Sequence, residues 1–285
     1  MQQVAKDLQG WVAFLSNNEI PILRQTLRDL NALRQSDDSA SALEISHIIA
    51  RDPLMTALLL RYLQLHKRRS QTSEVMEVEQ ALLMLGVDPF FNKVVSTLSV
   101  EDMLSTQTPA LVAALRVVHR SHRASSYAFD WAVRLRDLHF EEVRIAALLR
   151  DLAEILMWCF APTEMLKVKA MQDQDKSMRS SIAQEQVFGF SLKALQAELV
   201  KEWKLPVLLL HLMDSENSQQ ARVLNVVLAD RLARHSSHGW DDAALPDDYK
   251  VIGELLNMKV EDVMDIVGVI PTVDTPTDAG VKPGA

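Results

Sequence analysis

The sequence predicts an all-α protein, a multi-helix bundle with an N-terminal helical subdomain, and three observations indicate it. Only 8 of the 285 residues are glycine, and runs that alternate apolar and polar residues are almost absent, which disfavours β-strands. Capping residues repeatedly stand directly before a proline, and this pair often begins a helix. The side chain of the capping residue accepts from the free amides of the first turn, and proline fits into that turn. Between these starts, apolar residues recur at spacings of three and four.

The first part of the chain contains four such helix starts. Ser41 and Glu44 have the spacing of a capping box, in which each side chain satisfies a free backbone amide. Asp52-Pro53, Asp88-Pro89 and Thr108-Pro109 each place a capping residue before a proline. We therefore expect helices to begin at these four places.

Three longer apolar stripes predict helices in the rest of the chain. They run through residues 111–132, 145–156 and 223–232, and the first of them contains His122. Each stripe keeps the spacing that buries one face of a helix against its neighbours. We expect each to form one helix.

The helices are expected to form two closely packed subdomains, followed by a tail. The first subdomain covers residues 1–100 and the second covers residues 105–270. Residues 271–285 hold three prolines, Gly280 and Gly284, and they carry few apolar side chains. We expect this tail to be disordered, because it buries too little apolar surface to offset the entropy of ordering.

Composition and charge exclude several classes of protein. The net charge is −8, so the chain lacks the basic excess that a general nucleic-acid-binding protein uses to contact phosphates. The single cysteine, Cys159, excludes an internal disulfide framework and a cysteine-based zinc cluster. No secretory signal pattern opens the sequence, and its apolar runs fall far short of the ~18 residues of a membrane span. We therefore expect a cytoplasmic protein without nucleic-acid or membrane partners.

Five segments, taken in order, resemble the HDOD family. Residues 48–56 resemble its acid-proline-apolar-apolar-threonine helix, and residues 83–86 its leucine-glycine turn. Residues 147–153 stand where the family reads leucine-leucine-histidine-aspartate-isoleucine-glycine. Residues 202–206 resemble its tryptophan-x-leucine-proline corner, and residues 228–230 its late alanine-aspartate pair. The resemblance implies an all-helical, mostly non-catalytic relative of the metal-dependent HD phosphohydrolases, of the kind found in bacterial signalling proteins.

The resemblance also implies the position of a vestigial HD site. His122 fits the first histidine of such a site, with His119 as an alternative in register. Asp151 fits the aspartate of the histidine-aspartate pair, and Asp230 fits the late aspartate. The histidine of the pair is replaced by Arg150, which stays protonated and has no lone pair to offer a metal.

Two interpretations of these residues remain open. His122, Asp151 and Asp230 would suffice for a three-ligand metal site. In the second interpretation Arg150 pairs with the two carboxylates in place of a metal, since a guanidinium can bridge two carboxylates. We expect the second arrangement, and therefore no metal and no cofactor. Leu192 also stands where the family often has histidine.

The expected function is that of a non-enzymatic bacterial signal-transduction module. It would act in trans through signalling proteins or a small regulatory ligand, received in the cleft between the subdomains or on a helix face, and the resemblance leaves a homodimer open. The alternative is a metal-dependent phosphohydrolase of a nucleotide or cyclic dinucleotide, which Arg150 disfavours. A third interpretation is a nucleotide sensor, in which Arg120, Arg123 and Arg150 contact phosphate.

Overall fold

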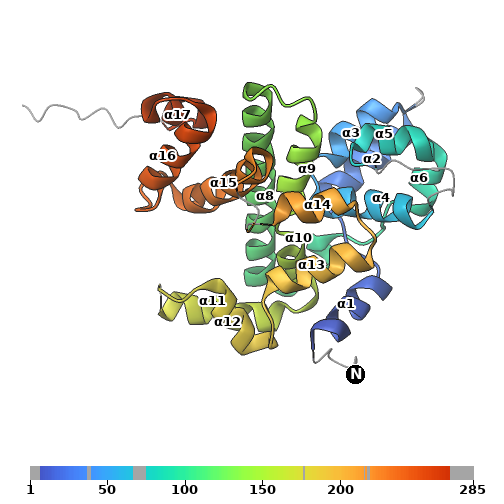
Figure 1. Cartoon of the computed structure of the whole chain (residues 1–285). Helices are drawn as coiled ribbons and strands as arrows, with labels where there is room; N and C mark the ends of the chain where they lie inside the picture. Colours follow the sequence, from blue (N-terminus) through green and yellow to red (C-terminus); the bar gives the residue numbers. More distant parts are fainter. Residues whose placement is uncertain are drawn as a thin grey trace, which may run out of the picture.

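The computed structural model describes residues 7–36, 40–66, 75–175, 177–214, 216 and 219–269. Within these ranges the regular structure is helical, apart from one isolated parallel bridge between Ile22 and Ser99, so the predicted all-α class is confirmed (Figure 1). The predicted disorder of residues 271–285 lies outside the described residues. No described helix combines the length and the apolar character needed to cross a membrane.

In the N-terminal part, the described residues form seven helices. They are α1 (Leu8–Asn17), α2 (Arg24–Gln35), α3 (Ala42–Ile49), α4 (Pro53–Leu65), α5 (Val78–Leu85), α6 (Val87–Lys93) and α7 (Val100–Met103). The predicted capping box of Ser41 and Glu44 forms at the start of α3. Asp88 lies inside the first turn of α6 and does not cap it, because Gly86, with a φ of 87°, already separates α5 from α6.

The remaining helices surround a long central one. They are α8 (Thr108–Arg134), α9 (Phe140–Leu149), α10 (Leu152–Phe160), α11 (Pro162–Gln174), α12 (Ser180–Phe188), α13 (Leu192–Glu202), α14 (Val207–Met213), α15 (Ala221–His235), the short 3₁₀ helix η2 (Ser236–His238), α16 (Leu245–Leu256) and α17 (Val260–Val267). Thr108 is the first residue of α8, so it does not cap that helix as expected. The stripe over 145–156 is two helices, not one, because the chain turns at residues 150 and 151.

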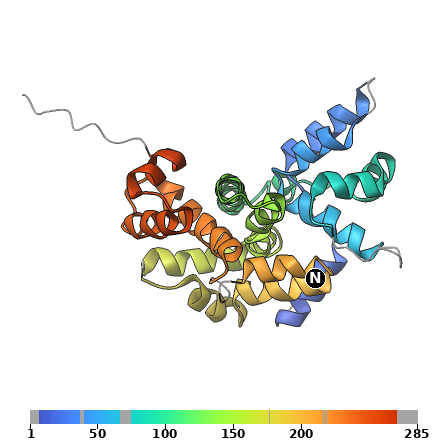
Figure 2. The same cartoon turned by 45° about the horizontal axis from the view of Figure 1, so that its top comes forward.

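Helix α8 is the axis of this second part. It packs against α9, α10, α11 and α15, and Figure 2 shows it nearly end-on between its neighbours. Its buried face carries short side chains, such as Ala114, Ala124 and Ala128, which let neighbouring helices approach closely. Several helices therefore contribute side chains to the same short stretch of α8.

The first helix crosses from the N-terminal part to the second part. Helix α1 packs on α13, and the buried indole of Trp203 donates to Ser16 Oγ at 2.9 Å. Arg61 of α4 lies over the Trp203 ring at 4.7 Å and donates to the Ser16 carbonyl oxygen at 2.6 Å. The boundary near residue 100 stays a prediction, and α1 connects the two sides of it.

A buried carboxylate joins the start of α4 to the segment before α2. Asp52 is fully buried, and it accepts from the amides of Leu54 at 2.9 Å and Met55 at 3.1 Å, as the sequence predicted for a cap. Its second oxygen accepts from the Leu23 amide at 2.8 Å. One side chain therefore satisfies three amides from two segments that are distant in the sequence.

We predict that Asp52→Ala lowers the free energy of unfolding by about 2–3 kcal/mol, because it leaves three amides without their acceptor. Asp7→Ala is the matched control, since Asp7 is exposed and, among the described residues, accepts from the Gly10 amide alone, at the start of α1. It should cost about 1 kcal/mol or less. Urea unfolding followed by circular dichroism measures both, and equal losses would contradict the role assigned to Asp52.

Candidate functional site

Six ionisable side chains meet in the second part of the chain, and we call them the arginine–carboxylate cluster. Its members come from α8, from the turn between α9 and α10, from α10 and from α15. They are Arg120, Arg150, Asp151, Glu154, Asp230 and Arg234. Three arginines face three carboxylates, so the formal charges of the cluster balance.

Asp151 accepts from two arginines. It occupies the position before the first residue of α10, yet its side chain does not cap that helix. Instead, Asp151 Oδ2 accepts from Arg120 Nε at 2.9 Å and from Arg120 Nη2 at 2.6 Å. Arg234 of α15 donates to the other oxygen at 3.3 Å, and Arg120 also donates to Glu154 at 2.8 Å. The two hydrogen bonds from Arg120 to one oxygen fix the turn between α9 and α10 against α8.

Arg150 connects the same turn to α14 and α15. Its Nε lies 3.3 Å from Asp230 Oδ2, and its Nη1 donates to the carbonyl oxygen of Met213 at 2.7 Å. Asp230 also lies 3.4 Å from Arg234, one turn further along α15. Arg150 therefore pairs with a carboxylate of the predicted site, and Arg120 and Arg234 complete the pairing.

A glutamine satisfies the backbone at the turn between α9 and α10. The Gln196 side chain, which α13 buries, accepts from the Ala153 amide at 2.7 Å and donates to the Leu149 carbonyl oxygen at 3.0 Å. These two groups lose their helical partners where α9 ends and α10 begins. Because Gln196 satisfies these backbone groups, the Asp151 side chain can accept hydrogen bonds from the arginines.

The charges and the burial in the cluster shift the pKa values of its two aspartates in opposite directions. Burial opposes ionisation of Asp151, but Arg120 and Arg234 outweigh it and hold its pKa well below the usual range. Burial and the charge of Asp151 raise the pKa of Asp230, against the opposite influence of Arg234 and Arg150. Burial disfavours the charge of Arg120 too, yet Asp151 and Glu154 raise its pKa above the ordinary value. The Asp151 carboxylate therefore stays ionised in the cluster.

The residues present do not fit a metal ion. Arg120 and Arg150 stand beside Asp151 and Asp230, where an HD site needs imidazole nitrogens, and a guanidinium offers no lone pair. Their positive charges also repel a dication. Among the described residues, no group of three or more histidine, cysteine, aspartate or glutamate side chains is arranged to hold one.

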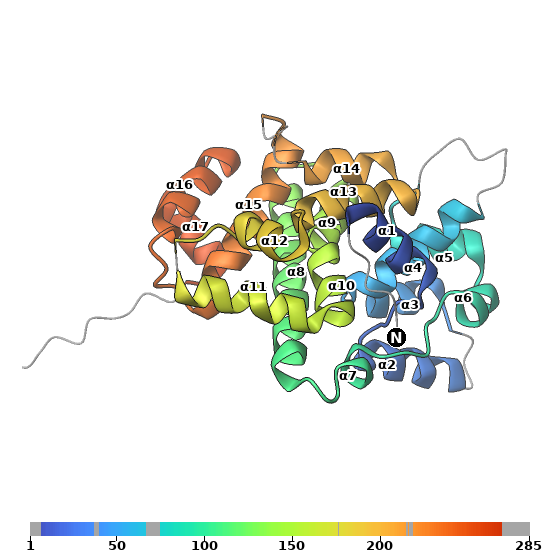
Figure 3. The ribbon, with the colours of Figure 1, turned by 90° about the horizontal axis from the view of Figure 1, so that it is seen from below.

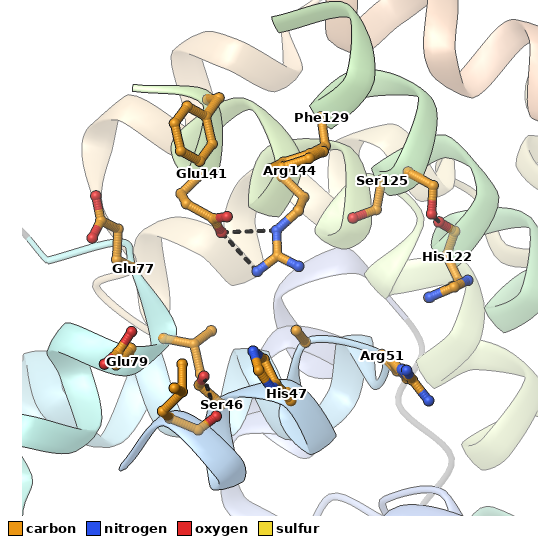
Figure 4. A pocket seen from close by; sticks show the side chains of 15 residues that line it. Ser46, His47, Arg51, Glu77, Glu79, His122, Ser125, Phe129, Glu141 and Arg144 are labelled. Carbon is orange, nitrogen blue, oxygen red and sulfur yellow. Dashed lines mark hydrogen bonds and ion pairs between the residues drawn. The ribbon is translucent and has the colours of Figure 1, made fainter. Parts of the chain in front are cut away.

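The structure does not bring His122 to the cluster. His122 lies two residues beyond Arg120 on α8, a rotation of about 200° around the helix, so it faces away from Asp151. It lines a different pocket, of about 720 Å³, between α3 and α5 on one side and α8 and α9 on the other (Figure 4). Burial and the charges of Arg51 and Arg144 lower its pKa. The α8 side chain that contacts Asp151 is therefore Arg120 and not His122.

The other predicted positions lie near the cluster or outside it. His119 lines a separate cavity beside Arg120, which is considered below. Leu192 lines a cavity of about 250 Å³ against the cluster, where it offers no ligand atom. Cys159 is buried, and burial raises its pKa to about 12, which keeps the thiol protonated.

Sequence reasoning missed Arg234 and gave Arg120 a different role. The signal for Arg234 was its spacing of four from Asp230, which places both side chains on one face of α15. Only the third interpretation used Arg120, as a phosphate contact with Arg123 and Arg150, whereas in the structure Arg120 binds Asp151 and Glu154. Nothing in the sequence fixed which face of α8 would turn toward Asp151.

A sequence profile described as the HDOD domain matches residues 20–219, which is more than half of the chain. The chain belongs to the HDOD family. Among solved structures, this HDOD protein resembles the MmoQ response regulator of Methylococcus capsulatus, with 16% sequence identity and a TM-score of 0.65, over 88% of this chain and 98% of that one. A virulence factor of Campylobacter jejuni also has 16% identity and a TM-score of 0.65, over 93% and 96%. No curated protein matches significantly.

We predict that Asp151→Ala destabilises the HDOD protein by about 3–5 kcal/mol, because it leaves the buried cluster with more positive than negative charge. Asp130→Ala is the matched control, since Asp130 pairs with Arg134 on the exposed face of α8. It should cost about 0.5 kcal/mol or less. Chemical unfolding of both variants tests this, and a small loss for Asp151→Ala would mean that Asp151 carries no structural charge.

The difference in stability between the parent and Asp151→Ala has a predictable pH dependence. Because the folded pKa of Asp151 is depressed, its stabilisation is present above the ordinary carboxyl pKa and is lost as the pH falls through the folded value. The stability difference between the parent and Asp151→Ala should therefore be constant near neutrality and shrink below about pH 4. Unfolding curves between pH 7 and pH 3 measure it, and a difference that grows with acidity would contradict the assignment.

Proposed function

We propose that this HDOD protein is a non-enzymatic regulatory module of bacterial signal transduction, acting in the cytoplasm. The observation that carries the proposal is that Arg120 and Arg150 hold the carboxylates of the vestigial HD site. A charge-balanced cluster serves as a fixed structural element, and it leaves no carboxylate available to activate water. The name of the MmoQ structure, a response regulator, supports the assignment to signalling.

Metal-dependent hydrolysis is disfavoured by the same residues. A metal phosphohydrolase binds a dication that activates water and stabilises the charge at phosphorus. Here two arginines occupy the space beside Asp151 and Asp230, and the oxygens of Asp151 accept from Arg120 and Arg234. An enzyme would have to displace these ion pairs before it could load a metal.

The pocket around His122 is the best-suited place for a signalling partner in trans. It lies between α3 and α5 of the N-terminal part and the central helices, and its wall mixes charges of both signs (Figure 4). His47, Arg51 and Arg144 provide basic groups, and Glu141 pairs with Arg144 at 2.6 Å. Phe129 adds an exposed aromatic ring. A partner bound here would contact both parts of the chain.

We predict no metal-dependent hydrolysis by the purified protein. Manganese, magnesium, iron, cobalt and nickel would each be supplied with nucleotides, cyclic dinucleotides and bis-p-nitrophenyl phosphate, and product would be measured against a buffer blank. We expect turnover at the blank level, because the site lacks imidazole ligands. Metal-dependent turnover that disappears in a folded Asp230→Asn variant would overturn the proposal.

A further inference from the structure

A second cavity, of about 680 Å³, lies beside the arginine–carboxylate cluster, and we call it the α8–α11 pocket. It is bounded by α8, α10, α11, α12, α15 and η2, several of which are seen together from below in Figure 3. It shares Arg120, Glu154 and Arg234 with the cluster. The pocket around His122 uses other residues of α8, so the two cavities are separate.

Basic side chains predominate in the wall of the α8–α11 pocket, although Arg120 and Arg234 are balanced within the cluster and Lys169 pairs with Asp173 at 2.6 Å. Glu154 is the wall's one acidic side chain among the described residues. Its arginine and lysine side chains are Arg116, Arg120, Arg123, Lys169 and Arg234. In a chain with a net charge of −8, this concentration of basic groups is not a consequence of composition.

Two of these arginines have no carboxylate partner among the described residues. Arg116 makes no ion pair there, and Arg123 donates to the Tyr127 hydroxyl at 2.8 Å and to the Ser236 carbonyl oxygen at 3.2 Å. Arg123 also lies over the Trp240 ring at 5.6 Å, which positions the guanidinium without neutralising it. Their positive charges remain available to an anion that enters the pocket.

The same cavity has an apolar wall. Trp158 of α10 and Met165 and Val168 of α11 line it, and Val112, which is 43% exposed, stands one turn before Arg116 on α8. Spacings of four and seven residues place Val112, Arg116 and Arg123 along one face of α8. The pocket therefore offers cations and an apolar surface side by side.

We propose that the α8–α11 pocket binds a small phosphorylated ligand with an aromatic or apolar body. The phosphate, with as many as two negative charges, meets Arg116, whose planar guanidinium group suits phosphate oxygens, and Arg123, held further along α8, adds positive charge to the pocket. The body of the ligand lies against Val112 and Trp158. The inference rests on the proposed function, because the ligand is bound as a signal and is not cleaved.

Phenyl phosphate is the simplest probe of this chemistry, and isothermal titration calorimetry on the full chain measures its binding. We expect saturable binding that weakens at higher ionic strength, and weaker binding of inorganic phosphate, which lacks the ring. Arg116→Ala should reduce the affinity about tenfold, the loss of one charge-assisted contact. Arg134→Ala, exposed on the same helix, and Lys193→Ala, in the cavity around Leu192, should leave it unchanged.

The outcomes separate the pocket from the proposed function. Absence of saturable phenyl phosphate binding, or equal affinity in the parent and Arg116→Ala, would overturn the proposal that the α8–α11 pocket binds a phosphorylated ligand. Equal affinity for phosphate and phenyl phosphate would overturn the apolar part of the site. Release of phenol during incubation, measured by absorbance, would overturn the non-enzymatic function and leave the binding site standing.

Discussion

The double hydrogen bond from Arg120 to one oxygen of Asp151 is the interaction on which the second part of the fold depends. It fixes the turn between α9 and α10 against the central helix, and it does so inside a cluster whose charges cancel. A buried ion pair adds little stability compared with well-packed apolar residues. Removing one of its partners is nevertheless strongly destabilising, and the pair forms only in a narrow range of geometries. The contact therefore specifies the register of α8 as much as it stabilises the protein.

This register divides α8 into two functional faces. One face presents Arg120 to Asp151 and, beside it, Arg116 and Arg123 to the α8–α11 pocket. The other presents His122 to the pocket between the N-terminal part and the central helices. The arginines of the cluster keep α8, α10 and α15 together, in the role that we propose a metal has in an active HD site. They also leave room next to the site for a ligand or a partner that is bound and not transformed.

Local signals predicted the helical class and two of the four expected helix caps, those of Ser41 and Asp52. The Ser41 capping box and the Asp52 cap depend on contacts within a few residues, so the sequence contains what determines them. The break at Asp151 was not predicted, because the apolar stripe continues through it and the turn is stabilised by Arg120 and Gln196 from other helices. The assignment of His122 failed for a related reason. An error of two residues on a helix points a side chain the other way, and tertiary contacts decide the register.

The central claim, that arginines stand in place of metal ligands, is tested most directly by titrating manganese or nickel into the parent and into an Arg120→His/Arg150→His variant. Isothermal titration calorimetry should show no binding at the cluster of the parent. The variant should bind an ion through two imidazoles and the carboxylates of Asp151 and Asp230. Stoichiometric binding by the parent that Asp230→Asn abolishes would contradict the claim, as would a folded variant that binds no better than the parent.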